Sequence, residues 1–305
     1  WKSLFILFML VISIIILMAA SGLIQDVMER HETNLDWLSV ILLVGLIGIM
    51  YVVDQAGKTN PAWGINTVIF IVSLIAIIWF CIRQLHLKHP LLELRVLKTF
   101  NYDLAILLTS ISYIALIVTT IIFPLYYQGV LKVSPFISGM SLVPGAAFLS
   151  ILNPLSGKLA DKIGFKPTML AGMFMIIIGW VAGLIVLNHL SLMGMILCAM
   201  VIEGGNAFVM MPAVTLGANA LPDELVPHGT AVITTVRQVL GSAGVTISTL
   251  ILTVATSNAL QRGSSAQVAS LHGYHLVFIG MIITELIGLV LAFMLKNTNK
   301  EKSTK

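Results

Sequence analysis

Apolar residues run through this sequence in uninterrupted stretches that water-soluble folds do not tolerate. A helix needs roughly 20 apolar residues to cross a hydrocarbon core of about 30 Å, and stretches of that length recur. Of the 305 residues, 58% are hydrophobic and only 10% are charged, whereas a soluble domain carries roughly 25% charged residues. The stretches show no period-two alternation, and backbone groups in lipid must be paired internally, so helices are expected rather than barrel strands. The sequence therefore predicts an all-α, polytopic membrane bundle.

The apolar stretches predict nine membrane spans. They cover residues 4–22, 35–54, 65–82, 104–127, 137–156, 168–187, 192–214, 229–255 and 274–295. A cleaved signal peptide is the alternative for the first stretch, because Lys2 precedes it and small residues end it. A retained helix is favoured, since its apolar part exceeds the ~7 to 15 residues of a signal peptide and eight more stretches follow. Trp1 is not a translation start, so we expect the chain to lack its natural N-terminus.

Lysine and arginine are divided unevenly between the segments that join the spans. Alternate segments on one side hold twelve of them: Arg30, Arg83, Lys88, Arg95, Lys98, Lys158, Lys162, Lys166, Lys296, Lys300, Lys302 and Lys305. The other side holds Lys2, Lys58, Lys132 and Arg262, and Arg237 lies within a span. Basic residues are retained on the cytoplasmic side of a membrane. We therefore expect a cytoplasmic C-terminus in a multi-pass protein of the cytoplasmic membrane.

The predicted spans fall into five consecutive parts. Residues 1–34 hold one span and a charged cytoplasmic loop, residues 35–84 form a tight helical hairpin, and residues 85–100 form a polar cytoplasmic linker. Residues 101–296 hold six spans joined by short loops, and residues 297–305 form a cytoplasmic tail. The six spans after the linker are predicted to be a structural unit of their own.

The sequence lacks the signatures of nucleotide-driven, metal-dependent and hydrolytic chemistry. Both cysteines lie inside apolar stretches, so no disulfide framework or zinc cluster is expected. His86 and His89, like His272 and His275, have the spacing of metal ligands, but no carboxylate or thiolate completes either pair, which favours solvated loop histidines. No glycine-rich nucleotide loop or serine elbow occurs. The net charge of +4 is spread between the apolar stretches, so we expect no nucleic acid as a partner. The missing motifs lead us to expect no cofactor or metal, and no enzyme.

A basic, glycine-containing segment joins the fifth and sixth predicted spans. It reads Gly157-Lys158-Leu159-Ala160-Asp161-Lys162-Ile163-Gly164-Phe165-Lys166-Pro167. Its small residues permit a tight turn, and Asp161 is expected to cap or face the N-terminus of the next helix. An ordinary basic loop is the alternative. The segment resembles the G-x-L-A-D-[RK]-x-G-[RK] signature of the major facilitator superfamily, which forms part of a cytoplasmic latch. Phe165 replaces the last basic residue of that signature, and Lys166 follows one position later.

Other stretches resemble the fourteen-span drug:proton antiporters of the EmrB/QacA type within that superfamily. They are His89-Pro90-Leu91-Leu92-Glu93-Leu94-Arg95, Phe123-Pro124-Leu125-Tyr126-Tyr127-Gln128, Ser134-Pro135, Gly139, Leu142-Val143-Pro144-Gly145 and Val236-Arg237-Gln238-Val239-Leu240-Gly241-Ser242-Ala243-Gly244-Val245. The resemblance covers essentially the whole chain. It implies that the nine spans are the last nine of fourteen: the last helix of the N-terminal half, the inserted hairpin and the C-terminal half. The fold would then be a partial one, without the first five helices.

Three Glu and Arg residues stand out within the predicted spans, since a charged side chain at the centre of the bilayer costs ~2.5 to 3.5 kcal/mol on insertion scales. Glu203 is mid-span, with Asn206 one turn on and on the same face. In a central cavity its carboxyl group would exchange a proton as the cavity changes sides. A buried hydrogen bond or an ion pair with Arg237 is the alternative, and Arg237 is expected to neutralise a carboxylate. Glu285 is mid-span in the last helix. Its two alternative roles are a proton site and an interhelical hydrogen bond.

Polar side chains recur at helical spacing on two further spans. The fourth span carries Thr109, Ser112, Tyr113 and Thr120, and the eighth carries Gln238, Ser242, Thr246 and Thr249. An aromatic ring with hydroxyls suits an amphiphilic substrate, and hydrogen bonds between neighbouring helices are the alternative. The candidate substrate-cavity residues are Ser112, Tyr113, Asn206, Gln238, Ser242 and Thr246.

The resemblance implies a proton-driven exporter whose two halves rock around a midplane site. Its expected partners are the lipid bilayer, protons, a lipophilic or cationic drug-like substrate, and the missing N-terminal half. The chain alone is expected not to transport, since alternating access needs two opposed repeats. A uniporter or symporter of small metabolites, and a non-transporting remnant or assembly module, are the alternatives. An intramembrane enzyme is not expected, because no converging acid, base or metal groups can be assembled.

Overall fold

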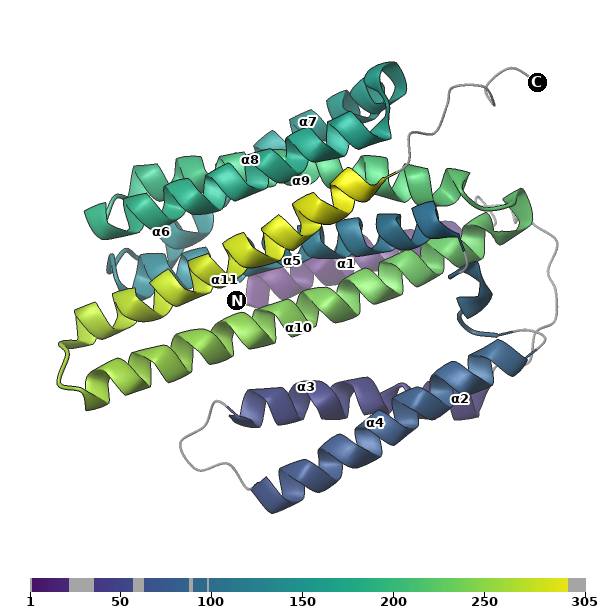
Figure 1. The fold of residues 1–305 in the computed structure, drawn as a ribbon, viewed down its shortest axis with the longest axis horizontal. Helices are drawn as coiled ribbons and strands as arrows, with labels where there is room; N and C mark the ends of the chain where they lie inside the picture. The colour runs from purple at the N-terminus through teal and green to yellow at the C-terminus, as the bar shows by residue number, and fades with distance from the viewer. Residues whose placement is uncertain (1, 22–35, 57–62, 88–89, 98, 296–305) are drawn as a thin grey trace. The chain divides into compact units, whose positions relative to one another are not determined.

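The computed structural model describes residues 2–21, 36–56, 63–87, 90–97 and 99–295. Within these ranges the regular structure is entirely helical, with no strand, which confirms the predicted all-α membrane fold (Figure 1). Seven of the described helical segments are long and apolar enough to cross a membrane. The predicted loop at Arg30, the hairpin turn at 57–62 and the tail at 297–305 lie outside the described residues.

Residues 1–36 form a unit of their own. It contains α1 (Lys2–Ala20), which coincides with the first predicted span. The apolar side chains from Phe5 to Met18 are exposed within this unit. The apolar stretch Phe5–Ala19 is shorter than the seven segments of membrane-crossing length.

The second unit, residues 37–305, begins with the predicted hairpin. Its helices are α2 (Trp37–Leu42), α3 (Val44–Ala56) and α4 (Trp63–His86). One continuous span is predicted at 35–54, but the helix is interrupted at Leu43, a break that hydropathy does not detect. A Cβ atom added to Gly45 would lie 2.7 Å from the carbonyl oxygen of Ser73, so α3 and α4 approach as closely as glycine permits. α3 also packs against α10.

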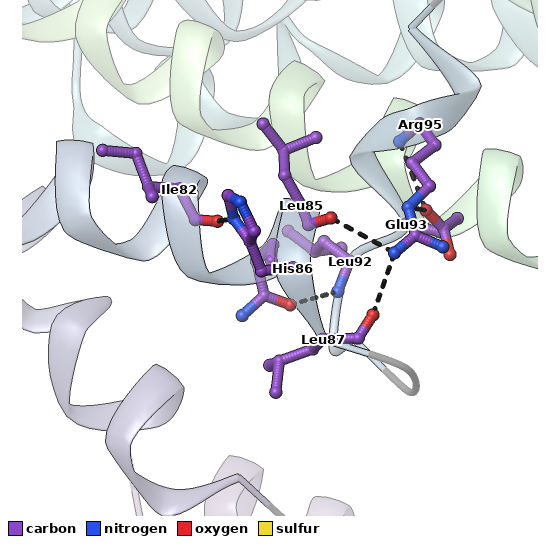
Figure 2. Close-up of polar contacts among 8 residues, drawn as sticks. Ile82, Leu85, His86, Leu87, Leu92, Glu93 and Arg95 are labelled. Atoms are coloured by element: carbon purple, nitrogen blue, oxygen red, sulfur yellow. Dashed lines mark hydrogen bonds and ion pairs between the residues drawn. The ribbon is translucent and has the colours of Figure 1, made fainter.

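A short linker ties the hairpin to the six-helix part. Gln84 at the end of α4 accepts a hydrogen bond from the backbone N–H of Leu92 at 3.1 Å. Arg95 donates from Nη2 to the carbonyl oxygens of Leu85 and Leu87, each at 3.1 Å, and so caps the end of α4 (Figure 2). The predicted polar linker is therefore folded back onto the helix that precedes it.

The six-helix part follows the linker. Its helices are α5 (Phe100–Gly129), α6 (Pro135–Met140), α7 (Val143–Ile163), α8 (Phe165–Val186), α9 (Leu192–Asn219), α10 (Val226–Gln261) and α11 (Ala266–Met294), with 3-10 turns at Leu187–His189 and Asp223–Leu225. The short α6 and α7 together form one segment of membrane-crossing length, Pro135–Ile163, so the described residues of this part contain six such segments. A further 3-10 turn, Leu94–Val96, lies in the linker. Most of these helices are longer than the spans predicted for them. α10 has 36 residues and is therefore about 54 Å long. Hydropathy detects only the apolar middle of such a helix, while the polar ends continue as helix outside the hydrocarbon core.

The core of the six-helix part lies among α5, α8, α9 and α11. Phe123 of α5 stacks on Phe278 of α11, with ring centroids 5.6 Å apart. Trp180 of α8 meets both rings edge-on, at 5.7 and 5.0 Å. A Cβ atom added to Gly172 of α8 would lie 2.7 Å from the carbonyl oxygen of Gly205 of α9. Aromatic packing and glycine contacts thus bring these helices together at different depths.

The segment predicted as a loop at 157–167 is helical except for one residue. α7 continues to Ile163 and α8 begins at Phe165, so Gly164 alone separates them. Gly164 has a φ of 100° and a ψ of 161°, a conformation that side chains strongly disfavour. The turn is therefore tight, as its small residues predict, but the predicted span ends at 156 and 168 are wrong, because the polar residues after the apolar stretch continue α7 as helix. Asp161 lies in the last turn of α7, and Gly164 takes the N-cap position of α8.

Candidate functional site

A polar contact between α5 and α9 lies near the middle of both helices. Ser112 donates a hydrogen bond from Oγ to Oδ1 of Asn206 at 2.5 Å, and both side chains are fully buried. Gly205 packs against Ile176 of α8, where an added Cβ atom would lie 2.6 Å from Cγ1 of that isoleucine. Two predicted cavity residues are therefore brought together, but inside the helix bundle.

Glu285 of α11 lies at a similar depth. Gly288, one turn further on, packs against Ile111 of α5 and Met173 of α8. Ile111 is adjacent to Ser112 in the chain, so Glu285 is close to the level of the polar contact between α5 and α9. Its side chain is 0% exposed, and neither carboxyl oxygen has a hydrogen-bond partner among the described residues. A carboxyl group is thus enclosed in a tightly packed interface of three helices.

Glu203 lies where α9 packs against α7. A Cβ atom added to Gly145 of α7 would lie 3.1 Å from Cγ of Glu203, so the side chain runs along the backbone of that glycine. The next residue, Gly204, faces the ring of Phe148. Glu203 is 7% exposed, and its Oε2 atom has no hydrogen-bond partner among the described residues. Gly145 belongs to a stretch that carries the family resemblance, but its contact with Glu203 is not predicted, although its small size within a predicted span is a signal for close approach.

Arg237 of α10 lies over an aromatic ring. Its guanidinium carbon is 5.0 Å from the ring centroid of Tyr113 of α5, which is a cation-π contact. The hydroxyl of Tyr113 donates to Oε1 of Gln238 at 2.8 Å. The ring also rests on Gly241, where an added Cβ atom would lie 2.6 Å from it. Within the described part of the chain Arg237 forms no ion pair, so the structure does not join it to Glu203 or Glu285.

The outer face of α10 next to this contact is polar. Gln238 and Ser242 are exposed, and Thr246 is half-buried. The hydroxyls of Thr246 and Thr249 donate to carbonyl oxygens of their own helix, four residues back. They therefore do not link neighbouring helices, and Gln238 and Ser242 keep their side chains on the open face. Of the other predicted polar residues, Thr120 is exposed and bonds to its own helix, while Thr109 is buried.

Lys166 joins the start of α8 to the end of α11. Its Nζ atom donates to the carbonyl oxygens of Phe293 at 2.6 Å and Leu295 at 2.9 Å. A cation at these carbonyls also complements the negative end of the α11 dipole. Lys166, the basic residue one position beyond the departure at Phe165, thus has a specific contact, whereas a Cβ atom added to Gly157 would lie in open space and Asp161 is exposed.

The histidines near the predicted spans make local hydrogen bonds. Nδ1 of His86 lies 2.8 Å from the carbonyl oxygen of Ile82, and Nε2 of His275 lies 2.8 Å from Oδ1 of Asn188. His89 is outside the described residues. Among those described, no three His, Cys, Asp or Glu side chains cluster as metal ligands would.

Known proteins resemble this chain over nearly its whole length. The Major Facilitator Superfamily profile matches residues 37–245. The uncharacterized MFS-type transporter YcnB of Bacillus subtilis is 36% identical over 304 residues, which cover 98% of this chain and 63% of that protein. The lincomycin resistance protein LmrB of Bacillus subtilis is 31% identical over 89% of this chain and 59% of its own length. The multidrug transporter protein MdtP of the same organism is 26% identical over 85% of this chain and 48% of its own length.

The chain thus spans less than two thirds of the length of these relatives. Its seven described segments of membrane-crossing length agree with a multi-pass membrane protein. The profile match covers more than half of the chain and includes both the hairpin and most of the six-helix part. The chain is therefore a member of the Major Facilitator Superfamily of membrane transporters.

Proposed function

We propose that this chain is the C-terminal part of a fourteen-span drug:proton antiporter, which exports drug-like compounds across the cytoplasmic membrane. Relatives named for lincomycin resistance and for multidrug transport support the substrate class. The hairpin of α2, α3 and α4 ahead of a six-helix part supports the fourteen-span arrangement. Alternating access would come from rocking of this part against an opposed N-terminal repeat.

The observation that carries the proposal is the buried carboxyl group of Glu203. It lies between two membrane helices, and one of its oxygens has no partner among the described residues. An ionisable group in that position favours its neutral form when dry and its charged form when water reaches it. Opening of the α7 and α9 interface would therefore release a proton, and closing would take one up. Glu285 is the second candidate for this role.

Substrate contact is proposed for the open face of α5 and α10. Tyr113, Gln238 and Ser242 offer an aromatic surface and hydrogen-bonding groups there, with Arg237 held against the ring of Tyr113. Lys166 is proposed to hold the cytoplasmic ends of α8 and α11 together in this conformation. Ser112 and Asn206 are better suited to helix packing, because both side chains are buried and bonded to each other. Thr246 is not proposed as a substrate contact, because its hydroxyl is bonded to a carbonyl oxygen of its own helix.

The test uses the full-length transporter in everted membrane vesicles. Addition of a drug substrate should cause proton release from energised vesicles, and Glu203→Gln should abolish it, since an amide does not titrate. Drug binding to the purified variant should persist. Glu224→Gln is the matched control, because Glu224 is an exposed carboxyl near the start of α10, and it should leave the proton release unchanged.

Unchanged proton release in Glu203→Gln would refute its assignment as the proton carrier. Loss of release in Glu285→Gln alone would move the role to α11. Drug-dependent proton movement in the direction of the drug would favour a symporter instead. Transport by the present chain alone, reconstituted without the remaining spans, would contradict the two-repeat mechanism.

A further inference from the structure

A groove of about 340 Å³ lies at the end of the hairpin formed by α10 and α11, away from every candidate transport residue. Its polar lining comprises Asn258 and Arg262 at the end of α10, Ser264 in the turn, and His272 on α11. Its apolar lining includes Val268 and Leu276. The groove therefore has a polar end and an apolar wall, as a binding site for an amphiphile requires.

The polar end is complementary to an anion. Arg262 brings a permanent positive charge, and the amide, hydroxyl and imidazole groups add hydrogen-bond donors. None of the described residues that line the groove is acidic. Within the described part of the chain, Arg262 also forms no ion pair. Arginine binds phosphate oxygens through two parallel N–H groups, so a phosphate group matches this end well.

The groove is expected to lie at the level of the lipid headgroups in the membrane. The turn between α10 and α11 is tight, with Gly263 at a φ of 85°. It lies at the opposite end of α11 from the contact with Lys166 (Figure 1). α11 has 29 residues and so spans about 44 Å, close to the thickness of a bilayer with its headgroups. The turn of the hairpin is therefore expected at the membrane–water boundary.

An exposed apolar face continues from the groove along α11. Its side chains are Leu276, Ile279, Ile283, Ile287 and Val290, all exposed. They recur every three or four residues and therefore lie on one face of the helix. Leu276 belongs both to this face and to the groove. A chain of methylene groups anchored at the groove could thus lie along α11 for about four turns.

We propose that the groove binds one anionic phospholipid, with its phosphate at Arg262 and His272 and an acyl chain along the exposed face of α11. A free phosphate ion would use only the polar end and would gain nothing from the apolar wall. The inference does not depend on the transported substrate or on proton coupling, because no residue of the groove takes part in either proposal.

The test is native mass spectrometry of the purified chain in a neutral detergent, titrated with dioleoyl phosphatidylglycerol or dioleoyl phosphatidylcholine. Phosphatidylglycerol should bind more tightly than phosphatidylcholine. Arg262→Gln should weaken phosphatidylglycerol binding about fivefold, the effect of one basic residue near a charged membrane. Leu276→Asn should weaken binding of the same lipid by removing part of the apolar wall.

Lys132→Gln is the matched control, since it removes an exposed cation that does not line the groove. It should leave the affinity for phosphatidylglycerol unchanged. Equal loss in Lys132→Gln and Arg262→Gln would overturn the proposal, because general charge attraction would then explain binding. Equal affinity for the two lipids, or displacement of phosphatidylglycerol by millimolar inorganic phosphate, would also overturn it. Unfolding temperatures without lipid establish that each variant is folded.

Discussion

Glu203 and Glu285 are both mid-helix carboxyl groups, but their surroundings differ. Glu203 retains 7% exposure beside Gly145, whereas Glu285 is 0% exposed among α5, α8 and α11. The sequence singles out both residues, because charge is rare within apolar stretches. It does not predict their neighbours, which depend on how each helix is rotated. The expected pairing of Arg237 with a carboxylate illustrates this, since rotation of α10 directs the guanidinium onto Tyr113.

Replacement of Glu285 by leucine should stabilise the isolated chain. An unpaired buried polar group costs ~1–3 kcal/mol, and leucine fills a similar volume without that cost. The variant should raise the apparent unfolding temperature in detergent by about 2–4 °C. Tryptophan fluorescence during heating measures it, with Met281→Leu, one turn earlier on the same buried face, as the control. A lower unfolding temperature would mean that the carboxyl group has a stabilising partner.

Helix lengths and helix packing were predictable to different degrees. The apolar stretches locate the helices, since lipid forces apolar side chains outward and backbone groups into hydrogen bonds. They do not reveal the break at Leu43, where hydropathy does not change, or the single-residue junction at Gly164, because the polar residues before it continue α7 as helix. The apolar stretches do not predict the crossing of α8 and α9 either. It depends on Gly172 and Gly205, two of 24 glycines whose contacts follow only from the assembled bundle.

Gly172→Ala should therefore destabilise the chain. Its Cβ atom would lie 2.7 Å from the carbonyl oxygen of Gly205, so α8 and α9 must separate, at a cost of about 1–3 kcal/mol. Gly280→Ala is the control, because the nearest atom to its Cβ would be Ile251 Cδ1 at an ordinary 3.9 Å. Thermal unfolding should separate the two variants. Equal unfolding temperatures would show that the crossing tolerates a methyl group.

The unit of residues 37–305 combines the hairpin, the linker and the six-helix part. Its all-α membrane class follows from the composition and from long apolar stretches without period-two alternation, and the structure confirms it for the described residues. The contact of Lys166 with the end of α11 agrees with the predicted order of spans, in which residues 158–166 and the C-terminus share one side. Which side faces the cytoplasm remains a prediction that rests on the distribution of lysine and arginine.

Cysteine labelling tests that orientation. In a chain with Cys81 and Cys198 replaced by alanine, Lys158→Cys should react with an impermeant maleimide only in everted vesicles. Lys132→Cys should react only in intact cells, because it lies on the other side of the predicted topology. Both lysines are exposed, so access to the cysteine depends on the membrane barrier. Labelling of Lys158→Cys in intact cells would reverse the topology.

The junction at Gly164 bears on how the protein enters the bilayer. One residue spans less than about 4 Å, so α7 and α8 cannot be released into lipid far apart. We therefore expect the two helices to enter the bilayer together. Both helices pack more extensively on α9 than on each other, so we expect their glycine-lined surfaces to be covered only once α9 has followed them. Assembly of this region is thereby expected to follow the order in which its helices are made.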